Sequence, residues 1–379
     1  MDNPESLPRL LFNASNLHVG GGLQVAVSVI TEWVEMGFLP SNLEIWVSSE
    51  IDSDLRSLGC DVSALPAYRV IDTYGIGLLF SSIGRSLSGF DRVFTLFGPL
   101  YRWQTGYFSI TGFAQAWIIC PNNEVSQRLP ILKRILLRGK FLVQKMFFRQ
   151  ADLLVAELDH VAASITSVGL CHRERVVVVK NCLGSIYSQP ERWVPLCRGL
   201  DGEKQIRIGF LGRNYDHKNT TILPEIAESL LKFHGLDVDF FVTFTDSEWR
   251  QCGTHFQRSI RNVGAVGIAE CPAFYEAMDA MIFPSLLECF SAMPLEALAM
   301  GKPLFASDRD FNRDVCGDHA MYFDPHSPES AARRIAEYFL SDPGERAKRI
   351  LTARQHALKF SSARTRAEEY LRILAMPST

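Results

Sequence analysis

The chain has 379 residues, of which 47% are hydrophobic and 21% are charged. This composition excludes a disordered, collagen-like or coiled-coil protein, and the length favours two domains. The formal net charge of −3 argues against a general nucleic-acid-binding protein. The nine cysteines form no C-x-x-C pair, and the N-terminus lacks the basic and apolar regions of a signal peptide. Both features favour a cytoplasmic location with reduced thiols.

The first half predicts buried parallel strands that alternate with helices. Short runs of Val, Ile, Leu and Phe without polar alternation are typical of strands covered on both faces. We expect strands at residues 9–13, 44–47, 92–96, 116–119, 153–155 and 176–179. A glycine loop, Gly20 to Gly22, separates the first strand from a helix at 23–35, and a long basic helix follows the fourth strand.

The strand-and-helix pattern lapses between residues 183 and 204, where glycines and prolines indicate a linker. It resumes with expected strands at 205–211, 238–244, 280–283, 303–306 and 321–323 and ends with helices at 329–340, 344–359 and 363–374. The sequence therefore predicts an α/β protein with domains at 1–182 and 205–362. A ligand cleft is expected between them, at the carboxyl ends of both sheets.

Two glutamates lie in the stretch 282–303, which predicts a strand, a turn, a loop and a helix that begins near Ser291. Glu288 lies in the loop and Glu296 in an early turn of the helix. A helix N-terminus directly after a parallel strand can bind a diphosphate through its free N–H groups. The two carboxylates can then accept the hydroxyls of a hexose and a ribose. Alternatively, Glu288 is a solvated loop acid and Glu296 stabilises the helix dipole.

Two cations follow the first strand of the second half, because Arg213 and Lys218 occupy the expected strand-to-helix loop. This loop belongs to the same sheet edge as Glu288, where the two cations could neutralise a diphosphate. Arg213 would bind it through two parallel hydrogen bonds and Lys218 as a point charge. In the competing interpretation, Lys218 is solvated and Arg213 pairs with an acid such as Asp216.

Three motifs in the second half resemble those of a known family. They are P-S-L-L-E-C-F-S at 284–291, L-E-A-L-A-M-G-K-P at 295–303 and G-R-N-Y-D-H-K at 212–218. Together they resemble the retaining glycosyltransferases of family 4, most of all bacterial enzymes that build O-antigen and other envelope polysaccharides. The resemblance is strongest over residues 205–323. It implies the GT-B fold, in which two Rossmann-like domains face a cleft and the final segment, 363–379, crosses back to the first domain.

The resemblance also implies roles for individual residues. Glu288 would contact the donor sugar, Glu296 the ribose, and Arg213 with Lys218 the diphosphate. Further donor contacts are implied for the backbone at Phe290, Ser291 and Ala292, for Gly264 to Val266 near the base, and for Gly21 and Gly22 in the first domain. A plain tight turn is nearly as good an interpretation of the glycine loop.

The sequence departs from the family pattern at two places. Cys289 and Ser291 stand where the family often has glycine. The family also often places a histidine beside the donor sugar, and the corresponding stretch, 117–123, has none. His18 and His160 are candidates by chain position alone, and a structural role is the favoured interpretation of each.

We expect neither a metal nor a cofactor. Asp308 with Asp310, and Asp237 with Asp239, match a D-x-D metal pattern, but matches of three residues are common. Fixed cations and dipoles would then stabilise the charge that develops on the leaving diphosphate.

Residues 128–149 carry a local excess of positive charge. This stretch has no acid and seven basic residues, which are Arg128, Lys133, Arg134, Arg138, Lys140, Lys145 and Arg149. Such an amphipathic helix is typical of contact with an anionic membrane. A helix packed on the core, with its cations in water or in ion pairs, is an equally good interpretation.

The leading hypothesis is a retaining glycosyltransferase that moves a hexose from a nucleotide-diphosphate sugar to a glycan or lipid-linked acceptor. Attack on the same face as departure is favoured over a covalent intermediate, because no carboxylate is clearly poised as a nucleophile. Two alternatives remain, a sugar-nucleotide epimerase of the same fold and a non-catalytic binding module.

Overall fold

The computed structural model describes residues 7–75, 77, 82–103, 106–201 and 206–376. By its internal contacts the chain forms two compact units. The first unit comprises the described residues up to Asn122, Leu129–Asn181 and the described residues from Ser362 onward. The second unit comprises Asn123–Arg128 and Cys182–Ser361.

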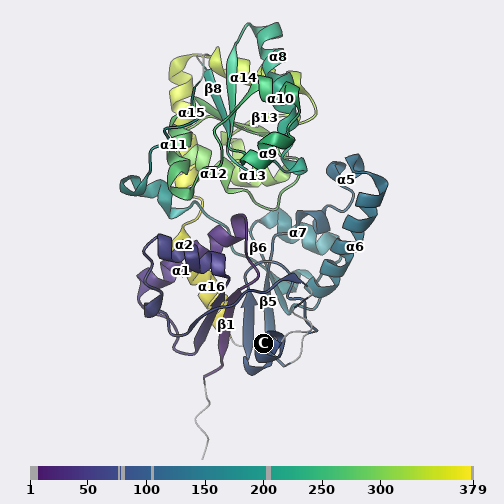
Figure 1. Ribbon diagram of the computed structural model, residues 1–379, viewed down its shortest axis with the longest axis vertical. Helices are drawn as coiled ribbons and strands as arrows, with labels where there is room; N and C mark the ends of the chain where they lie inside the picture. The colour runs from purple at the N-terminus through teal and green to yellow at the C-terminus, as the bar shows by residue number, and fades with distance from the viewer. Residues whose placement is uncertain (1–6, 76, 78–81, 104–105, 202–205, 377–379) are drawn as a thin grey trace, which may run out of the picture. The chain divides into compact units, whose positions relative to one another are not determined.

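The first unit is built on a seven-stranded parallel sheet in the order β3-β2-β1-β4-β5-β6-β7. Strands β1, β5 and β6 of this sheet are labelled in Figure 1. Its strands are β1 (Leu10–Ala14), β2 (Leu43–Val47), β3 (Tyr68–Val70), β4 (Arg92–Thr95), β5 (Phe108–Phe113), β6 (Leu153–Ala156) and β7 (Val176–Val178). Its helices are α1 (Gly21–Met36), α2 (Ser49–Ser57), α3 (Ser82–Ser86), α4 (Ala116–Ile119), α6 (Ile131–Phe148), α7 (Asp159–Ser167) and α16 (Ala363–Ala375).

The second unit has a six-stranded parallel sheet in the order β10-β9-β8-β11-β12-β13. Its strands are β8 (Ile206–Phe210), β9 (Val238–Val242), β10 (Ile260–Asn262), β11 (Ala280–Phe283), β12 (Leu304–Ser307) and β13 (Met321–Phe323). Its helices are α5 (Glu124–Arg128), α8 (Leu223–His234), α9 (Asp246–Gln251), α10 (Thr254–Ser259), α11 (Cys271–Glu276), α12 (Ala292–Ala299), α13 (Asp310–Cys316), α14 (Pro328–Phe339) and α15 (Pro343–Leu358). Both strand orders are Rossmann-like, which confirms the predicted fold class.

Most predicted strands are confirmed, and their burial explains why the sequence reveals them. Every residue of β1, β2, β4, β9, β11 and β12 is buried. Strands with helices on both faces require such continuous apolar runs. Residue 205, the first residue of the predicted strand 205–211, is not among the described residues.

One predicted strand is wrong. Residues 116–119 form the single helical turn α4, and the fourth strand of the prediction is replaced by β5, earlier in the chain. Trp117 of this turn stacks on Phe141 of α6, with ring centroids 5.8 Å apart. Within β5, a Cβ added at Gly112 would lie 1.5 Å from the carbonyl oxygen of Leu96, so only glycine fits there.

The glycine loop also differs from the prediction. Helix α1 begins at Gly21, so Gly21 and Gly22 belong to its first turn, and only Gly20, with φ at 81°, keeps a backbone conformation that favours glycine.

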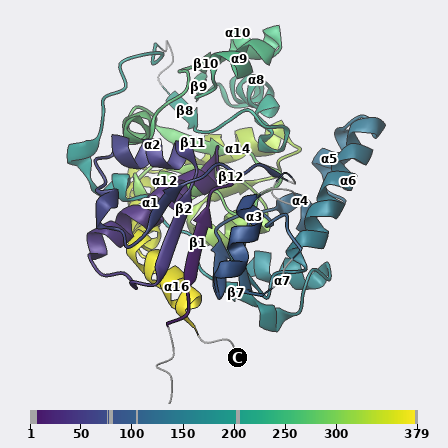
Figure 2. The ribbon, with the colours of Figure 1, turned by 60° about the horizontal axis from the view of Figure 1, so that its bottom comes forward.

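The C-terminal helix α16 packs inside the first unit, against α1, β1 and β4 (Figure 2). The indole Nε1 of Trp33 donates a hydrogen bond to the carbonyl of Ala367 at 3.0 Å, and the side chain of Arg92 donates to the carbonyls of Ile373 and Leu374. Among the described residues, no helix combines the length and apolar character needed to cross a membrane. All nine cysteines are free thiols.

Candidate active site

The site of the second unit lies where its strand order reverses. β8 is bonded to β9 on one side and to β11 on the other, so the connections after β8 and β11 leave the sheet in opposite directions. In open α/β sheets, ligands bind at this switch point, outside the carboxyl ends of the strands. The loop after β8 carries Arg213 and Lys218, and the loop after β11 carries Glu288.

The structure brings Lys218 and Glu288 into contact. Nζ of Lys218 lies 2.7 Å from Oε1 of Glu288, and the two side chains are only 14% and 11% exposed. The hydroxyl of Ser285 donates to the same carboxylate oxygen at 2.6 Å. Lys218 also lies over the ring of Phe283, 4.9 Å from its centroid. The pair is therefore a partly buried, hydrogen-bonded charge pair.

The backbone of His217 holds the two loops together. Its carbonyl oxygen accepts a hydrogen bond from the N–H of Leu286 at 2.7 Å and lies 3.1 Å from the hydroxyl oxygen of Ser285, whose shorter contact is the one to Glu288. The ring Nε2 lies 3.8 Å from Oε1 of Glu288, and burial lowers the pKa of His217. Asn219 ends this segment in the left-handed region, with φ at 53°, and its side-chain amide donates to the carbonyl of Pro325 at 2.9 Å.

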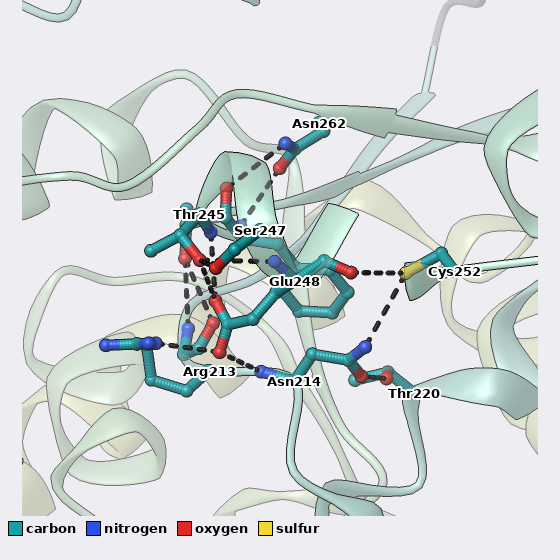
Figure 3. Close-up of polar contacts among 11 residues, drawn as sticks. Arg213, Asn214, Thr220, Thr245, Ser247, Glu248, Cys252 and Asn262 are labelled. Carbon is teal, nitrogen blue, oxygen red and sulfur yellow. Dashed lines mark hydrogen bonds and ion pairs between the residues drawn. The ribbon is translucent and has the colours of Figure 1, made fainter. Parts of the chain in front are cut away.

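Arg213 is paired, but with a different acid from the one suggested by the sequence. Its Nε donates to Oε1 of Glu248 at 2.8 Å, and the same oxygen accepts the N–H of Asn214 at 3.2 Å (Figure 3). Glu248 also completes the capping box of α9 with Thr245. Burial acts to raise the pKa of Glu248, but the hydrogen bonds from Arg213, Thr245 and Asn214 outweigh it and lower that pKa. The terminal nitrogens of Arg213 have no partner among the described residues.

Glu296 is held by two tyrosines. The hydroxyl of Tyr275, on α11, donates to Oε2 of Glu296 at 2.7 Å, and the hydroxyl of Tyr187 makes a second hydrogen bond to the carboxyl group. Burial raises the pKa of Glu296, and these two hydrogen bonds act in the opposite direction. The carboxyl group of Glu296 is thus buried and hydrogen-bonded rather than solvated.

The remaining predicted donor contacts of the second unit lie at the same sheet edge. Ser291 is the N-cap residue of α12 and makes no side-chain capping bond, while Ala292 is the first residue of the helix and Phe290 precedes them both. Gly264 and Val266 follow β10, and the N–H of Gly264 donates to the side chain of Asn262 at 3.2 Å. Asn262 in turn exchanges two hydrogen bonds with the backbone of Phe244, at the end of β9 (Figure 3).

Gly21 and Gly22 lie in the first unit, as does the candidate His18. Nδ1 of His18 lies 2.8 Å from Oε2 of Glu50, and its Nε2 lies 3.1 Å from the carbonyl oxygen of Thr73. Burial acts to lower the pKa of His18, but these bonds outweigh it and raise that pKa. Both ring nitrogens are engaged, so His18 joins the loop before α1 to the first turn of α2 and to the segment after β3. A cavity of about 410 Å³ adjoins it, lined by His18, Leu23, Ser49, Glu50, Ser53 and Asp54.

The groups that could bind a metal have other partners. His18, Glu50 and Asp72 have ligand atoms within 4.8 Å of one another and are the one such group found in the described part of the chain. Asp308 of the first D-x-D match pairs with Arg313 at 2.6 Å, and Asp239 of the second pairs with Arg261 at 3.3 Å. His160 lies on α7, outside the His18 cluster.

Sequence reasoning missed the residues that orient the predicted ones. His217 and Ser285 lie inside the motifs used for the prediction, so their positions beside Lys218 and Glu288 were available signals. Glu248, Tyr187 and Tyr275 come from segments with no motif, and only the folded chain shows that they reach the site.

Comparisons with known proteins show which proteins the chain is similar to. Residues 200–356 match the family described as Glycosyl transferases group 1. A D-inositol 3-phosphate glycosyltransferase of Salinispora tropica is 35% identical over 98 residues, which is 25% of this chain and 20% of the relative. The match thus spans about a fifth of the length of that curated relative.

Two solved structures share the fold over nearly the whole chain. A glycosyltransferase from Rickettsia africae ESF-5 has a TM-score of 0.67 at 15% identity, covering 96% of this chain and 97% of its own. WaaG, a glycosyltransferase involved in lipopolysaccharide biosynthesis, has a TM-score of 0.67 at 14% identity, with coverages of 96% and 98%. The chain therefore has the two-domain fold of these glycosyltransferases, and over residues 200–356 it is similar to the group 1 family.

Proposed function

We propose that the protein is a retaining glycosyltransferase of the GT-B type, which transfers a hexose-type sugar from a nucleotide-diphosphate sugar. The observation that carries the proposal is the partly buried pair Lys218–Glu288 at the switch point of the second sheet. The match of residues 200–356 to a glycosyltransferase family supports it.

In the proposed donor site, four side chains bind different parts of the nucleotide sugar. Glu288 accepts hydroxyls of the sugar, and Glu296 accepts those of the ribose. Lys218 and the terminal nitrogens of Arg213 bind the diphosphate, together with the N-terminal turn of α12 behind Phe290, Ser291 and Ala292. The loop at Gly264 and Val266 adjoins the base.

In the proposed mechanism, the bond between the anomeric carbon and the diphosphate oxygen breaks while positive charge around that oxygen stabilises the developing anion. The acceptor hydroxyl attacks from the same face, and a phosphate oxygen of the leaving group takes its proton, so the configuration is retained. Glu288 orients the donor sugar and Lys218 stays beside the diphosphate. Because fixed cations supply the charge, the proposal requires neither a metal nor a cofactor.

We propose a glycan or lipid-linked acceptor in the biosynthesis of an envelope polysaccharide, such as O-antigen or lipopolysaccharide, with the enzyme in the cytoplasm and at the inner face of the membrane. The support is the sequence resemblance and the fold shared with WaaG. No role for nucleic acid is proposed.

The decisive experiment measures release of nucleoside diphosphate from a panel of nucleotide sugars, with and without candidate acceptors and with a chelator present. Acceptor-dependent release supports a transferase. An isomerised donor without acceptor would establish the epimerase instead, and binding without turnover would establish the non-catalytic module.

Glu288→Gln keeps the size of the side chain but removes the charge opposite Lys218. It should lower kcat by roughly a hundredfold, in line with the loss of one group that acts on the transition state. The control is Glu276→Gln, at the exposed end of α11. Trapping a covalent glycosyl group on Glu288 would contradict the same-face mechanism.

A further inference from the structure

Helix α6 exposes large apolar side chains that no other part of the described structure covers. They are Ile131, Leu132, Ile135, Leu136, Leu142, Val143 and Met146, with exposures between 40% and 73%. In both views α6 lies at the outer edge of the first unit (Figures 1 and 2). We call these seven side chains the apolar face of α6.

The apolar face is continuous and lies opposite the side of the helix that packs on the protein. At about 100° per residue, the seven positions fall within a sector of roughly 140°. The packed side carries Gln144, Phe147 and Phe148, which are buried, and Phe148 lies against Phe113 with ring centroids 4.9 Å apart. The apolar face is therefore not needed to hold α6 on the first unit.

Exposed cations flank the apolar face. By the same geometry, Arg138 lies about 20° beyond one end of the apolar sector, and Lys140 and Lys133 lie about 40° and 60° beyond the other end. Among the described residues, none of these three has an acidic partner, and Lys140 lies beside the ring of Phe141. Lys145 and Arg149 instead donate to the carbonyls of Val168 and Gly169, at 2.9 Å each, and so anchor the end of α6 to the end of α7.

An exposed aromatic side chain lies beside α6. Trp103 is 57% exposed, and its ring lies 5.4 Å from that of Phe147, on the packed side of the helix. Tryptophan is enriched at the boundary between lipid tails and headgroups, because its ring is apolar and its N–H is polar.

The geometry points to an anionic lipid bilayer as the partner of this surface: we infer that α6 lies in the plane of the membrane, with its apolar face among the acyl chains and Lys133, Arg138 and Lys140 on the lipid phosphates. A helix with an apolar sector flanked by exposed cations fits a flat boundary of this kind. A second copy of the chain fits poorly, since a symmetric contact through α6 would bring like charges together. The inference does not depend on the proposed transferase activity.

The test is co-sedimentation of the full chain with vesicles of phosphatidylethanolamine and phosphatidylglycerol, against vesicles of phosphatidylcholine. The charge variant carries Lys133→Gln, Arg138→Gln and Lys140→Gln, and the apolar variant carries Leu132→Asn, Leu136→Asn and Leu142→Asn. We expect the wild type to bind the anionic vesicles and to lose binding at high salt. At about a fivefold loss for each of the three cations, the charge variant should bind roughly a hundredfold more weakly.

Matched controls come from helices of the second unit. Lys232→Gln, Lys348→Gln and Arg354→Gln remove three exposed cations, and Leu231→Asn with Phe233→Asn removes two exposed apolar side chains from α8. All five positions are at the surface, so every variant should fold, which circular dichroism would verify. The control variants should bind the vesicles as the wild type does.

Three results would overturn the inference. The first is equal binding to phosphatidylcholine and to anionic vesicles, and the second is undiminished binding of the charge or apolar variant. The third is a wild-type dimer in light scattering that the apolar variant abolishes while vesicle binding persists, which would assign the apolar face to contact between copies of the chain.

Discussion

The two tyrosine hydroxyls that hold Glu296 also control how its carboxyl group titrates. Burial raises the pKa of Glu296, while the hydrogen bonds from Tyr275 and Tyr187 favour the ionised form. An ionised Glu296 can accept two ribose hydroxyls, whereas a protonated one is a poorer acceptor. The tyrosines therefore act on the proposed ribose contact without touching the ribose.

Tyr275→Phe should raise the pKa of Glu296 further, because burial is then opposed by one hydrogen bond fewer. Affinity for a nucleoside diphosphate should fall most at acid pH, by about tenfold, as expected for one hydrogen bond to a charged group. Calorimetric titrations across a pH series would measure the shift. Tyr338→Phe, on α14, is the control. A uniform loss at every pH would indicate a purely structural role for Tyr275.

Glu157 titrates in a different setting, buried in the first unit. Burial raises its pKa to about 7, although the hydrogen bond from Asn181 and the charge of Arg366 act in the opposite direction. The folded protein therefore binds this proton more tightly than the unfolded chain does. The stability that Glu157 contributes is fully present below the unfolded pKa of about 4.5 and is lost as the pH rises through about 7.

Glu157→Gln removes this titration but keeps an acceptor for Asn181. Relative to the variant, the wild type should lose on the order of 3 kcal/mol of unfolding free energy between acid and mildly alkaline pH. Urea unfolding of both proteins at several pH values would measure the difference. Parallel curves for the two proteins would contradict the assignment of the raised pKa to Glu157.

Among the elements, a continuous apolar run decided which strands the sequence could predict. Of the three missed strands, β3 and β10 lie at the sheet edges and are partly exposed, whereas the buried β5 is interrupted by Ser109, Thr111 and Gly112. The wrong strand at 116–119 is an apolar run of four residues, and at that length a buried turn of helix has the same pattern as a strand. Periodicity alone could not separate the two.

The sequence could predict those contacts of the candidate site in which both residues belong to a motif. The meeting of Lys218 with Glu288 follows from the adjacency of β8 and β11, which a Rossmann-like strand order implies. The pairing of Arg213 with Glu248 depends on where α9 begins, and the sequence suggested Asp216 instead. Contacts between a motif and a segment without one require the folded chain.

Gly139 in α6 offers a test of the cost of a glycine inside a helix. A Cβ added there would meet no atom within 4 Å, and the residue has helical backbone geometry. Gly139→Ala should therefore raise the unfolding free energy by about 0.5–1 kcal/mol. Gly37→Ala is the matched control, because its Cβ also meets nothing but its φ of 65° disfavours alanine. Thermal unfolding should move in opposite directions for the two variants.

At the scale of the whole molecule, the chain leaves the first unit after Asn181 and returns to it at Ser362. Hydrogen bonds within the first unit join the segment where the chain leaves it to the segment where the chain returns. Arg366 donates to the side chains of Asn181 and Ser28. Helix α16 then completes the core of that unit with Ala367, Tyr370, Ile373 and Leu374, all buried. The first unit consequently depends on residues that follow the second unit in the chain.

Tyr370→Ala tests this dependence. Tyr370 is 2% exposed and its ring meets Phe94 edge-on, with centroids 5.0 Å apart, so truncation leaves a cavity beside β4. We expect a loss of about 3–5 kcal/mol of unfolding free energy, confined to the first unit. Differential scanning calorimetry with and without a nucleotide that binds the second unit would assign the transition. Leu351→Ala, at an exposed position of α15, should leave both transitions in place. If Tyr370→Ala lowered only the transition that the nucleotide raises, α16 would belong energetically to the second unit.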